Sequence, residues 1–153
     1  MPSKQKYFTK YINLMSDFGF KRIFGDEQNT EFLIDFLRHI LPHPDIESLE
    51  FLPTIQEREQ SGDRVAVFDL YCRLPNGERI MVEIQRIEQE YYIDRSIFYS
   101  SFSIKDQGKR GGWDYSLCPV YSISILNFLL DKKDKRVIKR VKLLDTSTHQ
   151  IFY

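Results

Sequence analysis

The sequence predicts an α/β fold, a single domain in which helices flank a central sheet. Helical patterns occupy the opening third of the chain, two strand patterns joined by a tight turn occupy the middle, and a further helix and strand come after them. At 153 residues with 42% hydrophobic side chains, the chain can bury a core without disulfides or metals. Because no linker or repeat divides it, we expect residues 1–153 to form one domain.

Two helices are expected near the start of the chain. Residues 17–25 predict a short helix that ends at a glycine. Residues 31–41 predict a second helix, capped by Asn29 or Thr30 and stopped by Pro42. One apolar stripe marks its buried face and comprises Phe32, Leu33, Phe36, Leu37 and Ile40.

The rest of the chain reads as strands with one more helix. In order, we expect strands at 46–53, 65–74 and 79–86, a helix at 91–107 that ends before Gly108, and strands at 120–130 and 141–144. A polar, charged stretch at 56–64 separates the first two strands. These elements would build the central sheet between the helices.

The loop at 75–77, Pro-Asn-Gly, predicts a hairpin between the strands at 65–74 and 79–86. Proline presets φ at the first turn position, asparagine tolerates the second, and glycine takes the left-handed bulge position of a three-residue loop. Such a loop pairs Leu74 with Glu78 and thereby fixes the register of the whole hairpin.

This register places Asp69 directly opposite Glu83. A two-residue Asn-Gly turn would instead place Asp69 opposite Ile84 and separate the two carboxylates. In the three-residue register, Asp69, Glu83 and Gln85 share the face away from the core. The core face is expected to contain Ala66, Phe68, Leu70, Cys72, Leu74, Val82 and Ile84.

Two facing carboxylates, with Cβ atoms about 5 Å apart, must be neutralised by a cation or a shared proton. The first interpretation is a divalent-metal site, because Mg²⁺ is held by a few carboxylate oxygens and completes its shell with water and phosphate. The second is a pair of ordinary strand residues neutralised by Arg73 or Arg95. The spacing alone leaves both interpretations open.

The charge pattern and the cysteines exclude several classes of protein. The chain has 22 Lys and Arg against 22 Asp and Glu, which argues against a generally cationic coat protein. Cys72 and Cys118 lack partners at metal-ligand spacing, so we expect a reducing, cytoplasmic location. No stretch approaches the roughly 18 apolar residues of a membrane span, and MPSKQKYFTK lacks a signal core, so we expect no membrane association.

A basic segment lies near the C-terminal end. Seven of the eleven residues 132–142 are Lys or Arg. The segment could bind a DNA backbone, with affinity that falls steeply with salt. Alternatively, it is a solvated hairpin between two strands. The final residues, 148–153, resemble the start of another strand, so we expect the chain to be a C-terminally truncated piece of a longer protein.

The order of several motifs resembles a known family. Asp69, followed by Glu83-Ile84-Gln85, resembles the PD-(D/E)xK phosphodiesterase motif in an E-x-Q variant. The segment DFGFKRIFG at 17–25 and the later positions Asp94-Arg95-Ser96-Ile97-Phe98-Tyr99, Gly108, Tyr115 and Pro119-Val120 also follow the order of this family. Over residues 14–130 the chain resembles the PD-(D/E)xK nuclease family of transposases, also called recombination-promoting nucleases.

The resemblance implies a restriction-endonuclease-like core with a central mixed β-sheet flanked by helices. It also implies an endonuclease linked to recombination or a mobile element, which hydrolyses DNA phosphodiester bonds with Mg²⁺ or Mn²⁺. Asp69 and Glu83 would bind the metal, with the carbonyl oxygen of Ile84 completing the set. Asp17 would supply the additional acidic group that such nucleases place on an N-terminal helix, with Glu31 as the alternative.

Gln85 occupies the position of the usual lysine and departs from the family pattern. Glutamine orients water or phosphate by hydrogen bonds but brings no positive charge. Arg95 or Lys21 could compensate, and both are expected to contact DNA. Arg95 and Tyr99 share a helix face, which suits phosphate contacts or, alternatively, a carboxylate pair and simple packing.

Two further hypotheses concern the whole protein. If the substitution at Gln85 abolishes catalysis, the chain is a nuclease-fold module that binds DNA or another protein. If it cuts both strands, it needs two sites, and a homodimer is the natural arrangement.

Overall fold

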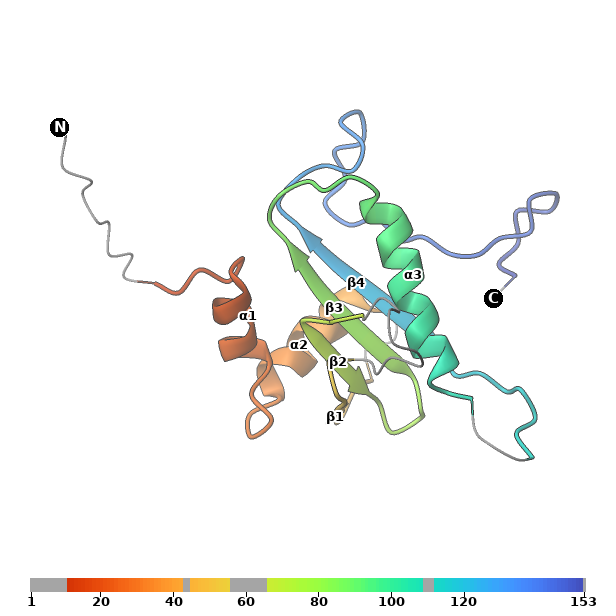
Figure 1. The fold of residues 1–153 in the computed structure, drawn as a ribbon, viewed down its shortest axis with the longest axis horizontal. Helices are drawn as coiled ribbons and strands as arrows, with labels where there is room; N and C mark the ends of the chain where they lie inside the picture. Colours follow the sequence, from red (N-terminus) through yellow and green to blue (C-terminus); the bar gives the residue numbers. More distant parts are fainter. Residues whose placement is uncertain (1–10, 43–44, 56–65, 109–111, 153) are drawn as a thin grey trace, which may run out of the picture.

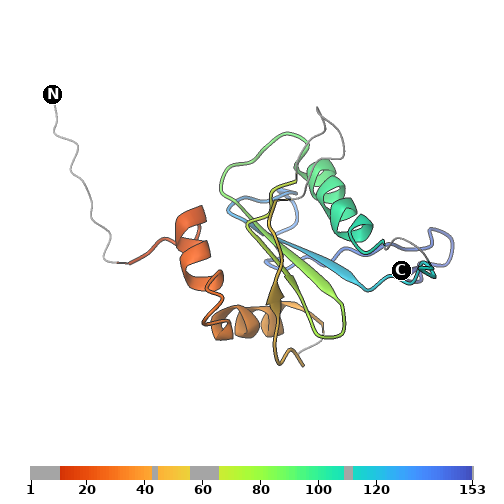
Figure 2. The ribbon, with the colours of Figure 1, turned by 60° about the horizontal axis from the view of Figure 1, so that its bottom comes forward.

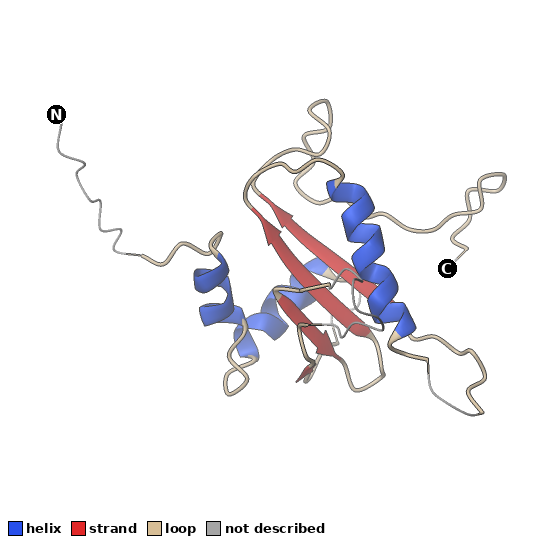
Figure 3. Cartoon of the chain, viewed as in Figure 1, coloured by secondary structure: helices blue, strands red, loops and turns tan. Residues whose placement is uncertain are grey.

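The computed structural model describes residues 11–42, 45–55, 66–108 and 112–152, and it shows a four-stranded mixed sheet with three helices (Figures 1 and 3). The strands lie in the order β1-β2-β3-β4, with β3 and β4 parallel and the other neighbours antiparallel. The elements are α1 (Asp17–Phe24), α2 (Glu31–Ile40), β1 (Glu50–Phe51), β2 (Leu70–Arg73), β3 (Arg79–Gln85), α3 (Tyr92–Lys105) and β4 (Val120–Leu126). The expected α/β class with a central mixed sheet is confirmed.

Helices α1 and α2 cover one face of the sheet (Figure 2). The hydroxyl of Ser16 accepts a hydrogen bond from the backbone N–H of Gly19 and so caps the start of α1, which ends at Gly25. Thr30 precedes α2 but makes no side-chain cap. The buried core on this face contains Phe20, Leu33, Ile34, Leu37, Ile46, Leu70, Cys72, Leu74, Ile80, Val82 and Ile123.

Helix α3 covers the opposite face, over a second and smaller core (Figure 2). This core contains Ala66, Phe68, Tyr71 and Met81, and Tyr99 and Phe102 of α3 pack against it. Because helices cover both faces, consecutive residues along β2 and β3 are buried, whichever face their side chains lie on. The sheet is therefore sandwiched between helices.

The hairpin register is confirmed. The backbone N–H of Leu74 donates to the carbonyl of Glu78 over 2.8 Å, and the ladder continues to the pair Leu70–Val82. Gly77 has a φ of +89°, the left-handed conformation that a three-residue loop requires at this position. The two-residue alternative, which would have separated the carboxylates, is excluded.

The ladder ends at Leu70, one residue short of Asp69, where the chain bends away from β3. By register, Phe68 should face Ile84, but its N–H donates to Thr54 instead, and the N–H of Ile84 donates to the Asp69 carboxylate. The bend reverses the alternation, so the prediction that Ala66 and Phe68 share the face of Leu70 is wrong. Both lie in the core beneath α3.

Several predicted strands are shorter than expected. The strand predicted at 46–53 is reduced to β1, that at 65–74 begins at Leu70, and that at 120–130 ends at Leu126. The stretch 56–64 lies outside the described residues. The prediction of a strand at 141–144 is wrong, because only an isolated bridge joins Leu144 to Ile151. The basic segment, residues 132–142, is thus irregular chain rather than part of a hairpin between two strands.

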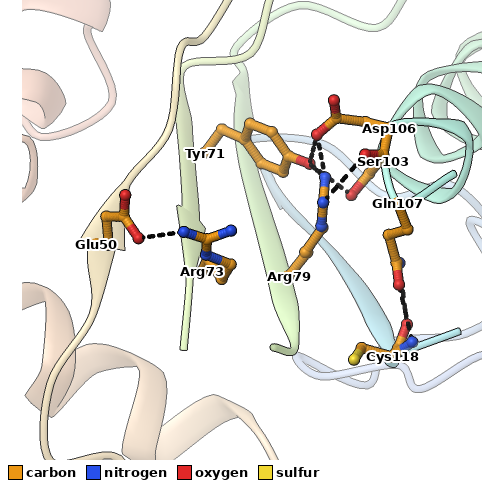
Figure 4. A network of polar contacts seen from close by, with 8 residues as sticks. All are labelled: Glu50, Tyr71, Arg73, Arg79, Ser103, Asp106, Gln107 and Cys118. Carbon is orange, nitrogen blue, oxygen red and sulfur yellow. Dashed lines mark hydrogen bonds and ion pairs between the residues drawn. The ribbon is translucent and has the colours of Figure 1, made fainter. Parts of the chain in front are cut away.

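A buried polar network fastens the C-terminal end of α3 to the sheet (Figure 4). The guanidinium of Arg79, which is only 9% exposed, donates to the hydroxyl of Tyr71 over 2.8 Å and forms an ion pair with the Asp106 carboxylate. The Tyr71 hydroxyl also shares a hydrogen bond of 3.0 Å with Ser103 of α3. A buried guanidinium that loses such partners is costly, so this network holds α3 in one place.

A second pair of hydrogen bonds supports the same end of α3. The side-chain amide of Gln107 donates to the carbonyl of Cys118 and accepts from its N–H, over 3.0 and 2.8 Å.

Cys72 and Cys118 are both free thiols. Within the described part of the chain, no helix is long and apolar enough to cross a bilayer.

We expect Gly77→Ala to lower the free energy of unfolding by about 1–2 kcal/mol, because alanine resists the left-handed conformation. Its Cβ would also stand 2.7 Å from the Sγ of Cys118. Gly112→Ala is the control, since nothing lies within 4 Å of a Cβ there. Urea unfolding of both variants gives the comparison, and equal effects would contradict our account of the turn.

Candidate functional site

The residues that the sequence singled out converge at the carboxyl end of β3, between α1 and α3 (Figure 1). Polar contacts link α1 to the bend before β2, that bend to β3, and β3 to α3. The residues brought together are Asp17, Lys21, Asp69, Glu83, Ile84, Gln85 and Arg95. The alternative to Asp17, Glu31, is exposed at the start of α2.

Asp69 is held by a backbone N–H near the carboxyl end of β3. Its Oδ2 accepts a hydrogen bond of 2.7 Å from the backbone N–H of Ile84, so the carboxylate takes the place of a strand carbonyl. The side chain is 21% exposed, and its Oδ1 lies 3.8 Å from the Nζ of Lys21. The bend therefore aims a half-buried carboxylate at α1.

Helix α1 brings one cation and one further carboxylate. Lys21 forms an ion pair of 2.6 Å with Asp17, one helical turn away on the same face. Asp17 also lies close enough to Asp69 to raise the pKa of that carboxyl. The burial of Phe20 in the core turns this face of α1 toward the sheet.

Glu83 points to the α3 side of the site. Its Oε1 accepts a hydrogen bond of 2.7 Å from the guanidinium of Arg95, and both side chains are mostly buried, at 22% and 29% exposed. Arg73, the other residue considered as a neutralising partner, pairs with Glu50 instead, over 2.6 Å. The cation that neutralises the pair from this side is therefore Arg95.

Gln85 shares the same guanidinium. The Nη2 of Arg95 donates to the side-chain carbonyl of Gln85 over 2.9 Å, while the Gln85 amide donates to the backbone carbonyl of Ile87 over 2.8 Å. The latter bond fixes the orientation of the Gln85 amide, so that its oxygen and not its nitrogen faces Arg95. The side-chain oxygens of Glu83 and Gln85 thus both accept hydrogen bonds from Arg95.

Two aromatic rings flank Arg95 beside these acceptor oxygens. Its guanidinium carbon lies 5.3 Å from the ring centre of Tyr92 and 5.7 Å from that of Tyr99, within the range of cation–π attraction. Tyr99 also packs edge-on against Phe68. The simpler expectation for these two positions, a carboxylate pair for Arg95 and packing for Tyr99, describes their observed contacts.

Burial, together with the charge of a neighbouring carboxylate, makes Asp69 and Glu83 hard to ionise. Burial is the main cause that raises the pKa of Asp69, opposed by the Ile84 N–H and Lys21. Burial likewise raises the pKa of Glu83; Arg95 opposes this rise, whereas the nearby charge of Asp69 adds to it. The site is therefore short of positive charge between its two carboxylates.

That shortage suits a divalent cation. The donor set of two carboxylates and the carbonyl of Ile84 is all oxygen, which hard cations such as Mg²⁺ and Mn²⁺ prefer, with water completing the shell. Among the residues that the structure describes, no group of three or more His, Cys, Asp or Glu is arranged to hold a metal. A set of two carboxylates and one carbonyl still fits Mg²⁺, which is usually held by one or two carboxylates.

Two contributors to the site escaped the sequence reasoning. Gln89 accepts a hydrogen bond from the second arm of the Arg95 guanidinium, and no pattern in the sequence marks it. Tyr92 precedes Arg95 by three residues, and this helical spacing could have identified it as a neighbour on the same face.

A family model described as PD-(D/E)XK nuclease family transposase matches residues 14–153. No curated protein and no solved structure matches the chain significantly. The match covers nearly the whole chain and includes every residue assembled at the site.

We expect Asp69→Asn to stabilise the protein more at pH 7 than at pH 4. The pKa of Asp69 is raised in the folded state, so ionisation at pH 7 disfavours folding, and protonation as the pH falls through that raised pKa removes the penalty. Asparagine never ionises and can still accept from Ile84. Urea unfolding at both pH values tests this, with the exposed Glu47→Gln as control; an equal difference at both pH values would contradict it.

Proposed function

The chain belongs to the PD-(D/E)XK nuclease family of transposases, and on this premise we propose that it is a metal-dependent DNA endonuclease that hydrolyses phosphodiester bonds. Membership indicates a nuclease-like function linked to mobile elements. The observation that supports the finer proposal is the convergence of Asp69 and Glu83 at one sheet edge, with Arg95 beside them.

In this proposal Asp69, Glu83 and the carbonyl oxygen of Ile84 hold Mg²⁺ or Mn²⁺. When bound, such an ion lowers the pKa of water and stabilises negative charge on a phosphate under attack. The chain holds these oxygens in place beforehand: the Ile84 N–H orients Asp69, and β3 fixes Glu83. Their raised pKa values reflect a demand for positive charge that the ion satisfies.

Arg95 supplies the charge that the missing lysine would bring. A guanidinium is always protonated and presents a planar fork that suits the two oxygens of a phosphate. Gln85 and Glu83 position this fork, and the Tyr92 and Tyr99 rings limit its movement. Gln85 thus acts as a positioning residue for Arg95 and also orients water or phosphate.

Lys21 and Asp17 form the opposite wall of the site. Lys21 is 43% exposed, so its ammonium can reach a DNA phosphate while it remains near Asp69. Asp17 holds Lys21 in position through their ion pair and adds negative charge on the side of α1. A homodimer remains our proposal for cutting both strands of a duplex.

We expect the protein to nick supercoiled plasmid with Mg²⁺ or Mn²⁺, and both Asp69→Asn and Glu83→Gln to lower the nicking rate by roughly 10²-fold or more. Each variant removes one charged ligand while keeping the size of the side chain. The exposed Glu47→Gln has the same chemistry away from the site and should cleave like the unmodified chain.

The outcomes separate the two functions considered for the chain. Equal nicking by Asp69→Asn and by the unmodified chain would place the activity elsewhere and overturn our assignment. Absence of nicking together with retained DNA binding would favour a catalytically inactive DNA-binding module.

We expect Arg95→Gln to lower the nicking rate at saturating DNA by roughly 10²-fold, and Arg95→Lys to retain part of the activity. Lysine keeps the charge but lacks the planar fork, whose Nη2 donates to both Glu83 and Gln85 while Nη1 donates to Gln89. Rates at saturating DNA, measured beside DNA affinity, distinguish catalysis from binding. A change in affinity alone would reduce Arg95 to a DNA contact.

A further inference from the structure

The chain beyond β4 leaves the sheet beside the site. Strands β3 and β4 are parallel, so their carboxyl ends lie at the same edge, and Gln85 is paired with Leu126. The backbone N–H of Asn127 donates to the carbonyl of Gln85 over 3.0 Å. In Figure 1 the segments after both arrowheads leave the sheet on this side. The chain after Asn127 therefore starts next to Gln85.

The basic segment, residues 132–142, lies a few residues beyond this point in the chain. The protein has 22 basic and 22 acidic side chains, and the segment contains seven of the basic ones and one of the acidic ones. The rest of the chain therefore has 15 basic and 21 acidic side chains. A chain with no net charge is thus divided into a strongly cationic segment and an acidic remainder. Any polyanion that binds this protein is repelled by the remainder and attracted to the segment.

Contacts at both ends fix the course of this segment. Just before its start, Phe128 packs edge-on against Tyr92, one of the two rings beside Arg95. Near its end, the guanidinium of Arg140 donates to the carbonyl of Ile40 at the end of α2 over 3.1 Å. The segment therefore runs from the site toward α2.

Internal pairing neutralises the single acidic residue of the segment. Asp134 forms ion pairs with Arg136 and Lys139, over 2.7 and 3.1 Å, and these partners lower its pKa. Four lysines remain exposed along the segment, namely Lys132, Lys133, Lys135 and Lys142. Their ammonium groups are the cations available to an external partner.

We propose that the basic segment is a phosphate-binding strap, which contacts the DNA backbone next to the site. This proposal rests on the proposed nuclease function and adds to it the surface that holds the substrate. DNA is favoured over an anionic membrane because the chain leading into the segment starts at Gln85 and because the acidic remainder disfavours a flat anionic surface. The exposed lysines contact phosphates and not base edges, so the strap binds all sequences equally.

The salt dependence of DNA binding tests this proposal. With EDTA present to prevent cleavage, the affinity for a fluorescein-labelled duplex is measured by anisotropy as the salt concentration is raised. Each phosphate contact contributes about 0.9 to the slope of log K against log salt, so Lys133→Gln with Lys135→Gln should reduce the slope by about 1.8. Lys132→Gln with Lys142→Gln provides an independent pair with the same expectation.

The matched control is Arg73→Gln with Lys105→Gln. It removes the same charge at the other end of the sheet, where Arg73 pairs with Arg79 in the hairpin register and Lys105 ends α3. Its slope should stay unchanged. A slope reduced equally by the control would show a response to net charge alone and would overturn the strap.

Further outcomes separate this proposal from the nuclease function. If the unmodified chain nicks plasmid but both strap variants keep its slope, the strap is wrong and the nuclease function stands. If the chain does not nick plasmid, but the strap variants reduce the slope of log K against log salt and the control does not, the strap is right and the nuclease function fails. Binding to vesicles of acidic phospholipid, lost in the strap variants, with no binding to duplex, would overturn the strap in favour of a membrane surface.

Discussion

Two half-buried carboxylates, Asp69 and Glu83, lie at the same end of the sheet, and the surrounding elements must supply positive charge to both. Burial raises the pKa of both Asp69 and Glu83, and a neighbouring carboxylate raises each further, since Asp17 acts on Asp69 and Asp69 acts on Glu83. Positive charge must come from both sides, and it does: Lys21 arrives from α1 and Arg95 from α3. The two helices on opposite faces of the sheet thus complete a single site, and neither face could supply it alone.

Polar contacts at the far end of the sheet hold helix α3 in this arrangement. The buried network of Arg79, Tyr71, Ser103 and Asp106 fixes the C-terminal end of α3, and the opposite end of the same helix presents Arg95 to Glu83. Helix α3 is therefore held at both ends by polar contacts to β3, one structural and one at the site. Such division is typical of functional sites, where unfavourable charge at one place is tolerated because the rest of the fold is well fastened.

Much of this geometry could be predicted from particular residues. The Pro-Asn-Gly loop specifies its own turn type, and the turn specifies the register that brings Asp69 near Glu83. The helix at 17–25 is predicted from Gly25, and that at 31–41 from its apolar spacing and Pro42. The predicted apolar stripe is wrong at Phe32, which is exposed, whereas Ile34 is buried. The bend at Asp69 could not be predicted, because the alternation of apolar and polar residues indicates an unbroken strand. In the structure, however, the Ile84 N–H donates to the Asp69 side chain. The face assigned to Ala66 and Phe68 was wrong for that reason.

The residue types and their order in the chain specify which chemistry is available, namely two carboxylates, a glutamine where the family usually has a lysine, and a cationic segment in an otherwise acidic chain. They can do so because turn preferences and strand alternation are local and are written in neighbouring residues. Which cations lie beside the two carboxylates depends on the tertiary structure. Arg95 and Lys21 lie on separate helices, and their distances to Glu83 and Asp69 depend on packing across both faces of the sheet, which no short stretch of sequence encodes.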